Sequence, residues 1–238
     1  MDRAQGMSLL PTAMPPVLGP AWAGGVFLAE VLDVVDPQGL ARVKVRLHAT
    51  AGVADQDGPV WASVVSGFAG DRRGAFWIPD VGDLVAVAFV QGDVRFPLVL
   101  GGIWTGSAVP PESMDGSGQN NLKVIRSRNG VKITLDDTDG QERIRLETPG
   151  GQAITLSDGP GACKVEDANG NSIKMEAAGI TITASAKVTV NAPQVNVSAG
   201  MVQVDAGLSR FSGVVQCDTL IANAVISASY TPGAGNIW

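Results

Sequence analysis

From residue 131 onward, apolar and polar side chains alternate in short runs, and this pattern constrains the fold more than any other feature. Apolar residues separated by one polar residue form one face of a β-strand, because successive side chains of a strand point to opposite sides. Each run supplies only two or three such residues, so a single run cannot bury its own apolar face. The runs are as follows: Val131, Ile133 and Leu135; Ile144 and Leu146; Ile154 and Leu156; Cys163 and Val165; Ile173 and Met175; Ile180 and Ile182; Val188 and Val190; Val195 and Val197; and Val202 and Val204.

The spacing between successive runs shortens along the chain. Counted from Ile133 between first members, the steps are 11, 10, 9, 10, 7, 8, 7 and 7 residues. The early runs are separated by turn sequences rich in Asp, Gly and Asn, such as 136–140, 157–161 and 167–171, whereas the later runs leave little room for a turn. A short regular period of this kind predicts a stacked β architecture.

Two arrangements could complete the layers of such a stack. In a single-chain β-solenoid, each run is one side of a triangular coil. In a trimer, each of three chains supplies one strand per layer, and the backbone hydrogen bonds run between chains. We favour the trimer, because small inward residues and scarce aromatics leave a thin core for one chain. The expected trimer core consists of Ile133, Ile144, Ile154, Ile173, Ile180, Ile182, Val188, Val190, Val195, Val197, Val202 and Val204.

The N-terminal half has a different pattern, in which short β-branched runs are broken by Gly, Asp and Pro. The sequence Asp-Pro-Gln-Gly at 36–39 is a turn signal, so the first two runs should form a hairpin. In the second run three cations alternate with three aliphatic residues, which directs the aliphatic side chains into a core. Five strands of this length predict a small barrel. The runs are 26–35, 41–47, 60–66, 84–91 and 96–100.

The composition argues against an enzyme and against a metal or cofactor site. His48 is the only histidine, which removes most histidine-dependent catalysis and clustered metal ligation. Cys163 and Cys217 show no metal-binding spacing and are expected to be packed thiols. The net charge of −6 makes a polyanion-binding surface across the whole chain improbable. We therefore expect no catalytic residue, no metal and no cofactor.

These patterns divide the chain into five segments. Prolines interrupt the apolar N-terminal segment, which is therefore no signal peptide, and no apolar run is long enough for a membrane-spanning helix. In this segment Leu9, Leu10 and Trp22 could contact a larger partner. At the other end, Ile237 and Trp238 either plug the stack or bind a separate cap. The expected segments are a Pro-rich arm (1–24), a small barrel (25–106), a linker (107–121), a stacked β region (122–229) and a C-terminal segment (230–238).

Residues 40–101 also carry a set of motifs in a fixed order. They are LARVKVRL at 40–47, Trp61, GDRRG at 70–74, FWIPDVGD at 76–83, Val85, Val87, Phe89, Gly92, Asp93, Arg95, Pro97 and VLG at 99–101. This set resembles the OB-fold domain of baseplate spike proteins. That group includes baseplate assembly protein V of contractile-tailed phages and the VgrG spikes of type VI secretion and extracellular injection systems.

The resemblance implies an all-β fold, with an N-terminal OB-fold barrel followed by an intertwined trimeric β-helix or β-prism needle. It implies a homotrimeric central spike in the baseplate of a phage tail or an injection particle, which joins the hub and tube to the tip. Such a spike pierces the target envelope when the sheath contracts and touches the target membrane transiently.

The chain also departs from parts of this group. VgrG chains carry a large hub region before the OB domain, whereas about 24 residues precede it here, so we expect the hub on a separate chain. The linker is too short for a lysozyme domain. Some short phage spikes bind iron at an HxH site, but no histidine follows His48, so this site does not carry over. A separate PAAR-type tip protein is the expected substitute.

Two other functions compete with the spike. OB barrels often bind nucleic acid or sugars through aromatic side chains in a basic groove. However, the acidic chain and the repetitive shaft favour no nucleic-acid partner. The other alternative is the tip of a trimeric receptor-binding fibre. The residues that could form a binding patch are Arg42, Lys44, Arg46, Arg72, Arg73, Trp61, Phe68, Phe76 and Trp77.

Overall fold

The computed structural model of the chain describes residues 24–52, 58–158 and 163–229. Within these residues the regular elements are β-strands and short 3-10 segments such as η2 (Val90–Gly92), which confirms the all-β prediction. No helix in the described part of the chain is long and apolar enough to cross a membrane. The chain divides into two compact units, Met1–Lys187 and Val188–Trp238.

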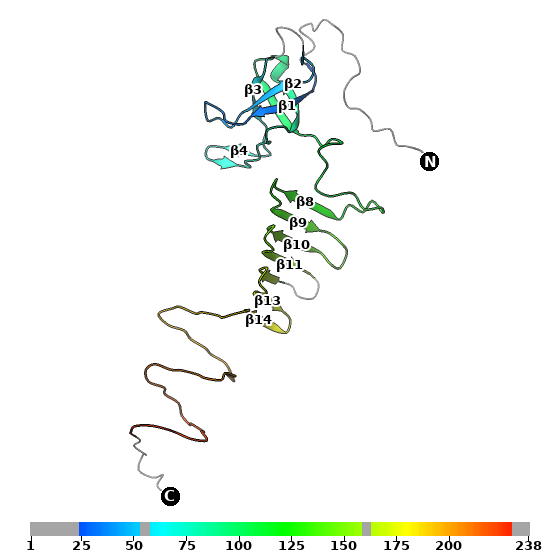
Figure 1. The fold of residues 1–238 in the computed structure, drawn as a ribbon. Helices are drawn as coiled ribbons and strands as arrows, with labels where there is room; N and C mark the ends of the chain where they lie inside the picture. The colour runs from blue at the N-terminus through cyan, green and yellow to red at the C-terminus, as the bar shows by residue number, and fades with distance from the viewer. Residues whose placement is uncertain (1–23, 53–57, 159–162, 230–238) are drawn as a thin grey trace. The chain divides into compact units, whose positions relative to one another are not determined.

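The first five long strands close into a barrel (Figure 1). Neighbouring strands are antiparallel except for β3 and β7, which pair in parallel. Each predicted strand run overlaps one observed strand, and the barrel is consistent with the expected OB-fold. In barrel order the strands are β1 (Phe27–Asp33), β2 (Val43–Leu47), β3 (Val60–Val64), β7 (Pro97–Gly102) and β6 (Leu84–Phe89).

Small aliphatic side chains fill the barrel. Val43 and Val45 of β2 are fully buried and Leu47 is partly buried, as the alternation of β2 predicts. The predicted turn between β1 and β2 is confirmed, because the Gly39 amide donates to the Asp36 carbonyl at 3.0 Å. The fully buried aliphatic residues of the barrel are Ala29, Val31, Val43, Val45, Ala62, Val85, Val87 and Val99.

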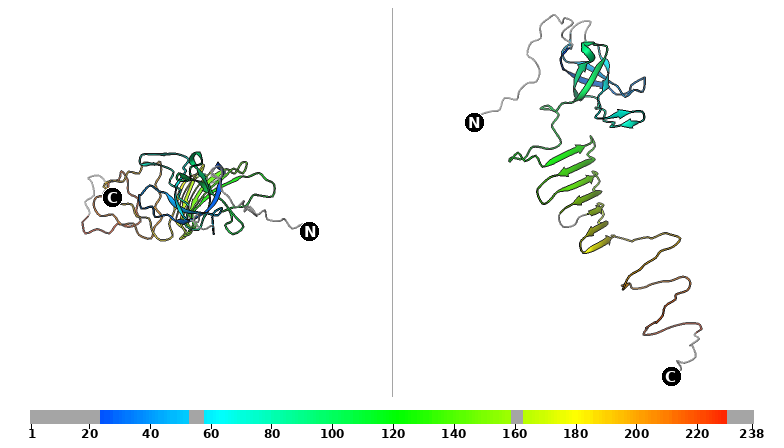
Figure 2. Two further views of the ribbon diagram at one scale, coloured as in Figure 1. Left: turned by 90° about the horizontal axis from the view of Figure 1, so that it is seen from above. Right: turned by 180° about the vertical axis from the view of Figure 1, so that it is seen from behind.

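The second part of the first unit is a seven-stranded antiparallel sheet in which every strand pairs with the next one in sequence. Figure 2 shows these strands following one another side by side. The strands are β8 (Leu122–Arg126), β9 (Lys132–Asp136), β10 (Arg143–Glu147), β11 (Ala153–Ser157), β12 (Cys163–Glu166), β13 (Ser172–Glu176) and β14 (Gly179–Thr183).

This pairing corrects one prediction. We expected backbone hydrogen bonds between chains throughout the stack, but from residue 122 to 183 they run within one chain. The reason is loop length, because the segments between these strands are long enough to form hairpin turns. Sequence analysis also missed β8 and a short hairpin formed by β4 (Ala69–Gly70) and β5 (Arg73–Gly74).

The second unit has no strand among its described residues, 188–229. This segment runs as an open zigzag whose legs are well separated in both figures, unlike the neighbouring strands of the sheet (Figures 1 and 2). The predicted strand runs at Val188, Val195 and Val202 lie within this segment, with bends at residues 193 and 200 between them. A single copy of the chain therefore leaves this half of the predicted needle without strand pairing.

Candidate assembly site

One face of the seven-stranded sheet consists almost entirely of apolar side chains, and we call it the apolar face. The strand register aligns these side chains in two columns across the strands. The first column contains Ile125, Ile133, Leu146, Ile154, Val165, Ile173 and Ile182. The second contains Leu135, Ile144, Leu156, Cys163, Met175 and Ile180.

The apolar face is open in a single chain. The side chain of Ile154, at its centre, is 43% exposed, and Ile180 on the last strand is 69% exposed. Contiguous exposed apolar surface of this extent is typical of an interaction site. The structure places six predicted core residues together on this face, namely Ile133, Ile144, Ile154, Ile173, Ile180 and Ile182.

Sequence analysis missed Ile125 as part of this face. Its strand contains Lys123 where the second column would begin, so the apolar alternation of β8 is interrupted. The signal that could have found it is the glycine-containing turn between the two strands, because a hairpin at that turn places Ile125 opposite Ile133.

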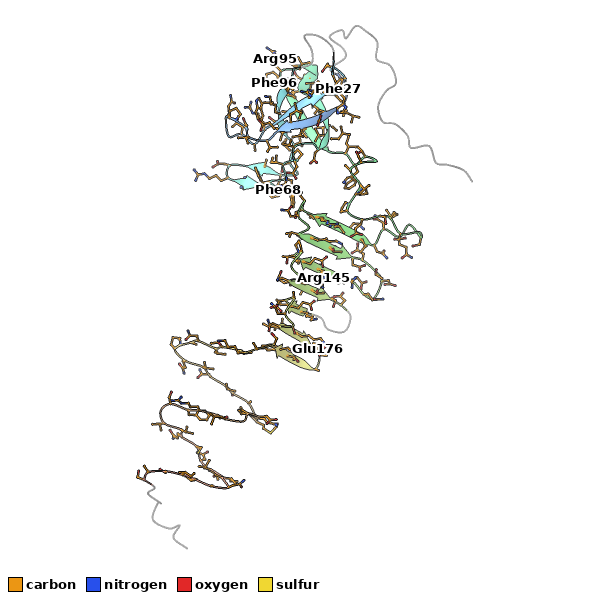
Figure 3. The ribbon with its side chains drawn as sticks, in the orientation of Figure 1. Phe27, Phe68, Arg95, Phe96, Arg145 and Glu176 are labelled. Atoms are coloured by element: carbon orange, nitrogen blue, oxygen red, sulfur yellow. The ribbon has the colours of Figure 1, made fainter. Side chains whose placement is uncertain are left out.

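The opposite face of the sheet is polar and carries ion pairs. Arg145 of β10 contacts Glu147 at 2.9 Å and Glu166 of β12 at 3.5 Å, and it donates a hydrogen bond to Thr155 of the intervening strand. Figure 3 labels Arg145 and Glu176 on this sheet. Hydrogen bonding from Arg145 lowers the pKa of Glu147. Hydrogen bonding from Lys164, followed by the charges of Lys164 and Arg145, lowers the pKa of Glu166. These charges suit a face that stays in water.

Three hairpin turns on the same side of the sheet, where they connect the ends of neighbouring strands, share one geometry. They span 127–131, 148–152 and 167–171, and each has a glycine with positive φ at its fourth position. In each turn the amide of the first residue donates to the carbonyl of the fifth, at 2.8, 3.0 and 3.1 Å respectively. In the third turn, hydrogen bonds from Asn171 are the main cause that lowers the pKa of Asp167 to about 2.

The stacking of these turns restricts two of the three glycines. A Cβ atom at Gly130 would lie 3.2 Å from Pro149 Cγ, and one at Gly151 would lie 3.0 Å from Ala168 Cβ. Pro149 and Ala168 are the second residues of the following turns. Gly170, in the last turn, has no such neighbour within 4 Å. The three turns therefore pack directly on one another in a row at the strand ends.

The barrel surface brings together part of the predicted basic patch. The Arg42 guanidinium lies 5.8 Å and the Lys44 ammonium 6.0 Å from the centroid of a Trp61 ring. Arg42 also forms an ion pair with Asp36 at 2.7 Å, and its hydrogen bonds hold the pKa of that carboxyl well below the usual range. Because an internal carboxylate already engages Arg42, this arrangement does not favour a nucleic-acid site.

Of the other predicted patch residues, Arg46 lies on β2, and the rest lie on the segment between β3 and β6. Phe68, Phe76 and Trp77 are largely exposed there, and Arg72 and Arg73 lie at the turn of the β4–β5 hairpin. Figure 3 labels Phe68 in this region. The segment is therefore a second exposed surface, in which aromatic side chains and cations occur together.

The remaining predicted residues form no chemical site in the described part of the chain. His48 follows β2, and its backbone amide donates to the Leu28 carbonyl at 2.9 Å. Cys163 lies on the apolar face, whereas Cys217 is exposed in the single chain. The described residues contain no group of three His, Cys, Asp or Glu side chains that could hold a metal ion. The expected contact residues Leu9, Leu10, Trp22, Ile237 and Trp238 lie outside the described residues.

Comparison with known families identifies the two β regions. Residues 27–104 match the type VI secretion system and phage-baseplate injector OB domain. Residues 143–203 match the phage baseplate V C-terminal trimerisation domain. Both matches support a VgrG-like baseplate spike. The matched trimerisation domain supports a homotrimer, and it contains β10 to β14, the last five of the seven strands that form the apolar face.

Curated proteins similar to this chain are type VI secretion system spike proteins. The type VI secretion system spike protein VgrG1a of Pseudomonas aeruginosa is 28% identical over 161 residues, which are 61% of this chain and 24% of the relative. VgrG1b of the same organism is 27% identical over 66% of this chain and 22% of its own length. VgrG4b is 34% identical over 43% of this chain and 13% of its own. The matched part of this chain thus spans at most about a quarter of each relative.

Proposed function

We propose that the chain is the subunit of a homotrimeric central spike at the baseplate of a contractile tail or injection particle. The spike joins the hub and tube to the tip and pierces the target envelope when the sheath contracts. The observation that carries this proposal is the incompleteness of a single copy. One copy leaves the apolar face open and leaves residues 188–229 without strands.

Three copies would complete the sheet region by packing their apolar faces together around a common axis. The ion-paired faces would then point outward into water. Moving the exposed half of one isoleucine side chain out of water contributes on the order of 1 kcal/mol. Both columns of the apolar face contribute in each copy, so the total is large even after the entropy of association is subtracted.

The second unit would be completed by strand pairing between copies. Its apolar residues recur at seven-residue steps, and Val188, Val195 and Val202 mark successive legs. If three copies share one axis, the legs of two copies fill the space between the legs of the third. The resulting backbone pairing would make a stiff shaft with few free strand edges, which suits the transmission of an axial force.

The partners are proposed from the family and from the segments outside the described residues. The Pro-rich arm, with Leu9, Leu10 and Trp22, would bind a hub protein on a separate chain. The segment 230–238, with Ile237 and Trp238, would contact a PAAR-type tip protein. The relatives are named as type VI secretion spike proteins, which supports this location. The segment plan of arm, barrel, linker, needle and tip is part of this proposal.

The deciding experiment is the mass of the purified chain by light scattering. The proposal requires three times the chain mass of 24.4 kDa. A protein that remains a folded monomer would contradict it. A second measurement, electron microscopy of assembled particles with a gold-labelled chain, should locate the label on the central axis of the baseplate. A label on peripheral fibres would instead support the receptor-binding alternative.

A further inference from the structure

The two edges of the seven-stranded sheet differ in how they resist pairing with another strand. Exposed edge strands usually carry charges, prolines or bulges that prevent unwanted pairing. The β8 edge has Lys123 and Arg126, and Lys123 lies 3.7 Å from Asp137. The β14 edge has the sequence Gly-Ile-Thr-Ile-Thr, with no charge and no proline. By this criterion β14 is an edge that accepts a further strand.

The chain that follows β14 turns away from this open edge. The amide and the hydroxyl of Ser185 donate to the side-chain oxygen of Asn171 at 2.8 and 3.2 Å. Asn171 immediately precedes β13, and β13 pairs with β14 on its closed side, where Ser172 faces Thr183. Ser185 therefore holds the residues directly after β14 toward β13, away from the free edge of β14.

The segment 187–191 has the pattern that the open edge requires. The two columns of the apolar face end at Ile180 and Ile182, which are separated by one residue. Val188 and Val190 have the same separation and are 61% and 70% exposed. A strand centred on Thr189 would therefore extend both columns by one layer in either strand direction, because each apolar pair is symmetric about its central residue.

We propose that the free edge of β14 is completed by residues 188–190 of a second copy of the chain. This seam is where pairing within a chain gives way to pairing between chains, and it rests on the proposed homotrimer. With three copies and seven-residue steps, the segments that extend each copy's sheet beyond β14 would follow one another in a fixed order. After β14 of one copy come 188–190 of the second, 195–197 of the third and 202–204 of the first.

The experiment is a disulfide test between differently tagged full-length chains. Both native cysteines are first replaced (Cys163→Ala and Cys217→Ser). One chain then carries Thr181→Cys and the other Thr189→Cys, and the two are co-expressed. Thr181 pairs with Lys174 on the polar face, and Thr189 is central between Val188 and Val190, so the proposal puts the new thiols opposite each other. Oxidation should give a cross-linked heterodimer on a non-reducing gel.

The matched control replaces Thr189→Cys with Asn196→Cys, the equivalent position on the next leg. Two strand spacings separate it from β14 in the proposed order, about 9–10 Å, which is too far for a disulfide. Each single-cysteine chain expressed alone should also give no cross-link. A trimer by light scattering without the Thr181–Thr189 heterodimer, or with an equal Thr181–Asn196 product, would overturn the seam and leave the trimer standing. A monomer would instead overturn the proposed function.

Discussion

Gly151 and Gly170 occupy equivalent positions in two turns, yet their surroundings differ. Their φ angles are 85° and 83°, so replacement by alanine imposes a similar backbone strain of about 1–2 kcal/mol at either site. Only at Gly151 would the new methyl group also collide with Ala168, at 3.0 Å. We expect Gly151→Ala to lower the free energy of unfolding by about 1–3 kcal/mol more than Gly170→Ala. Thermal unfolding of the two variants, followed by circular dichroism, measures this difference, and equal midpoints would argue against stacked turns.

Asp167 makes the turn before β13 sensitive to acid. Hydrogen bonds from Asn171 lower its pKa from the ordinary value of 3.8 to about 2. A depressed carboxyl pKa means that its stabilisation is fully present above the unfolded-state pKa and is lost as the pH falls through the folded-state pKa. We therefore expect the unfolding midpoint to fall as the pH decreases from about 4 to about 2.

The matched variant for this pH dependence is Asp167→Asn. Its amide cannot ionise, so the variant should be less stable than the native chain at neutral pH, and its midpoint should fall less over the acid range. Thermal scans of both proteins at several pH values provide the measurement. Parallel pH profiles for the two proteins would show that Asp167 makes no contribution to the acid response.

At the scale of the strand, the two sides of β11 should respond oppositely to charge. Ile154 lies in the apolar face, whereas its neighbour Thr155 points to the polar face and accepts a hydrogen bond from Arg145. In a trimer, Ile154→Asp would bury carboxylates without partners, which costs several kcal/mol, about 2–7 for each buried polar group. Thr155→Asp would place its charge near Arg145. We expect the first variant to lose the trimer and the second to keep it, as measured by light scattering. Trimers from both variants would rule out the apolar face as the interface.

Sequence reasoning located most strands but assigned the backbone hydrogen bonds of β8 to β14 to pairing between chains, whereas they run within one chain. The alternation at Ile144, Ile154 and Ile173 fixes which side chains share a face, because side-chain direction has a period of two residues. It does not say which strand lies alongside, and pairing within or between chains gives the same alternation. Turn length carries only part of that information, because the seven-residue step to Ile180 still forms a hairpin between β13 and β14, and pairing within the chain ends only at Thr183.

The β4–β5 hairpin and β8 were missed for different reasons. The hairpin strands contain two residues each, which is too short for any periodic signal. Its base is instead held by the Ser66 hydroxyl, which donates to the carbonyls of Phe68 and Ala75, each at 2.9 Å. In β8 the polar Lys123 occupies an apolar column and hides the pattern. Local composition therefore predicts a strand only where alternation is long and unbroken.

For the whole molecule, the structure separates two ways in which copies can hold one another. The sheet pairs its strands within one chain, so copies would meet over its apolar face through side chains. The segment 188–229 has no strand of its own, so its order in the spike would depend on other copies. Side-chain contacts can separate and re-form, whereas interleaved strands must unwind before a copy can leave. Kinetic stability is therefore expected to reside in the distal segment.

A chain that ends at Lys187 tests this division. It retains the barrel and the complete seven-stranded sheet, so its circular dichroism spectrum should keep the β signal. We expect it to dissociate in sodium dodecyl sulfate without heating, because only side-chain contacts would hold its copies together. A chain that ends at residue 229 is the matched control, since it keeps every described leg and should stay trimeric in the detergent. Equal detergent resistance of both truncations would show that contacts of residues up to Lys187 hold the copies together. It would then remove the structural reason for an interleaved shaft.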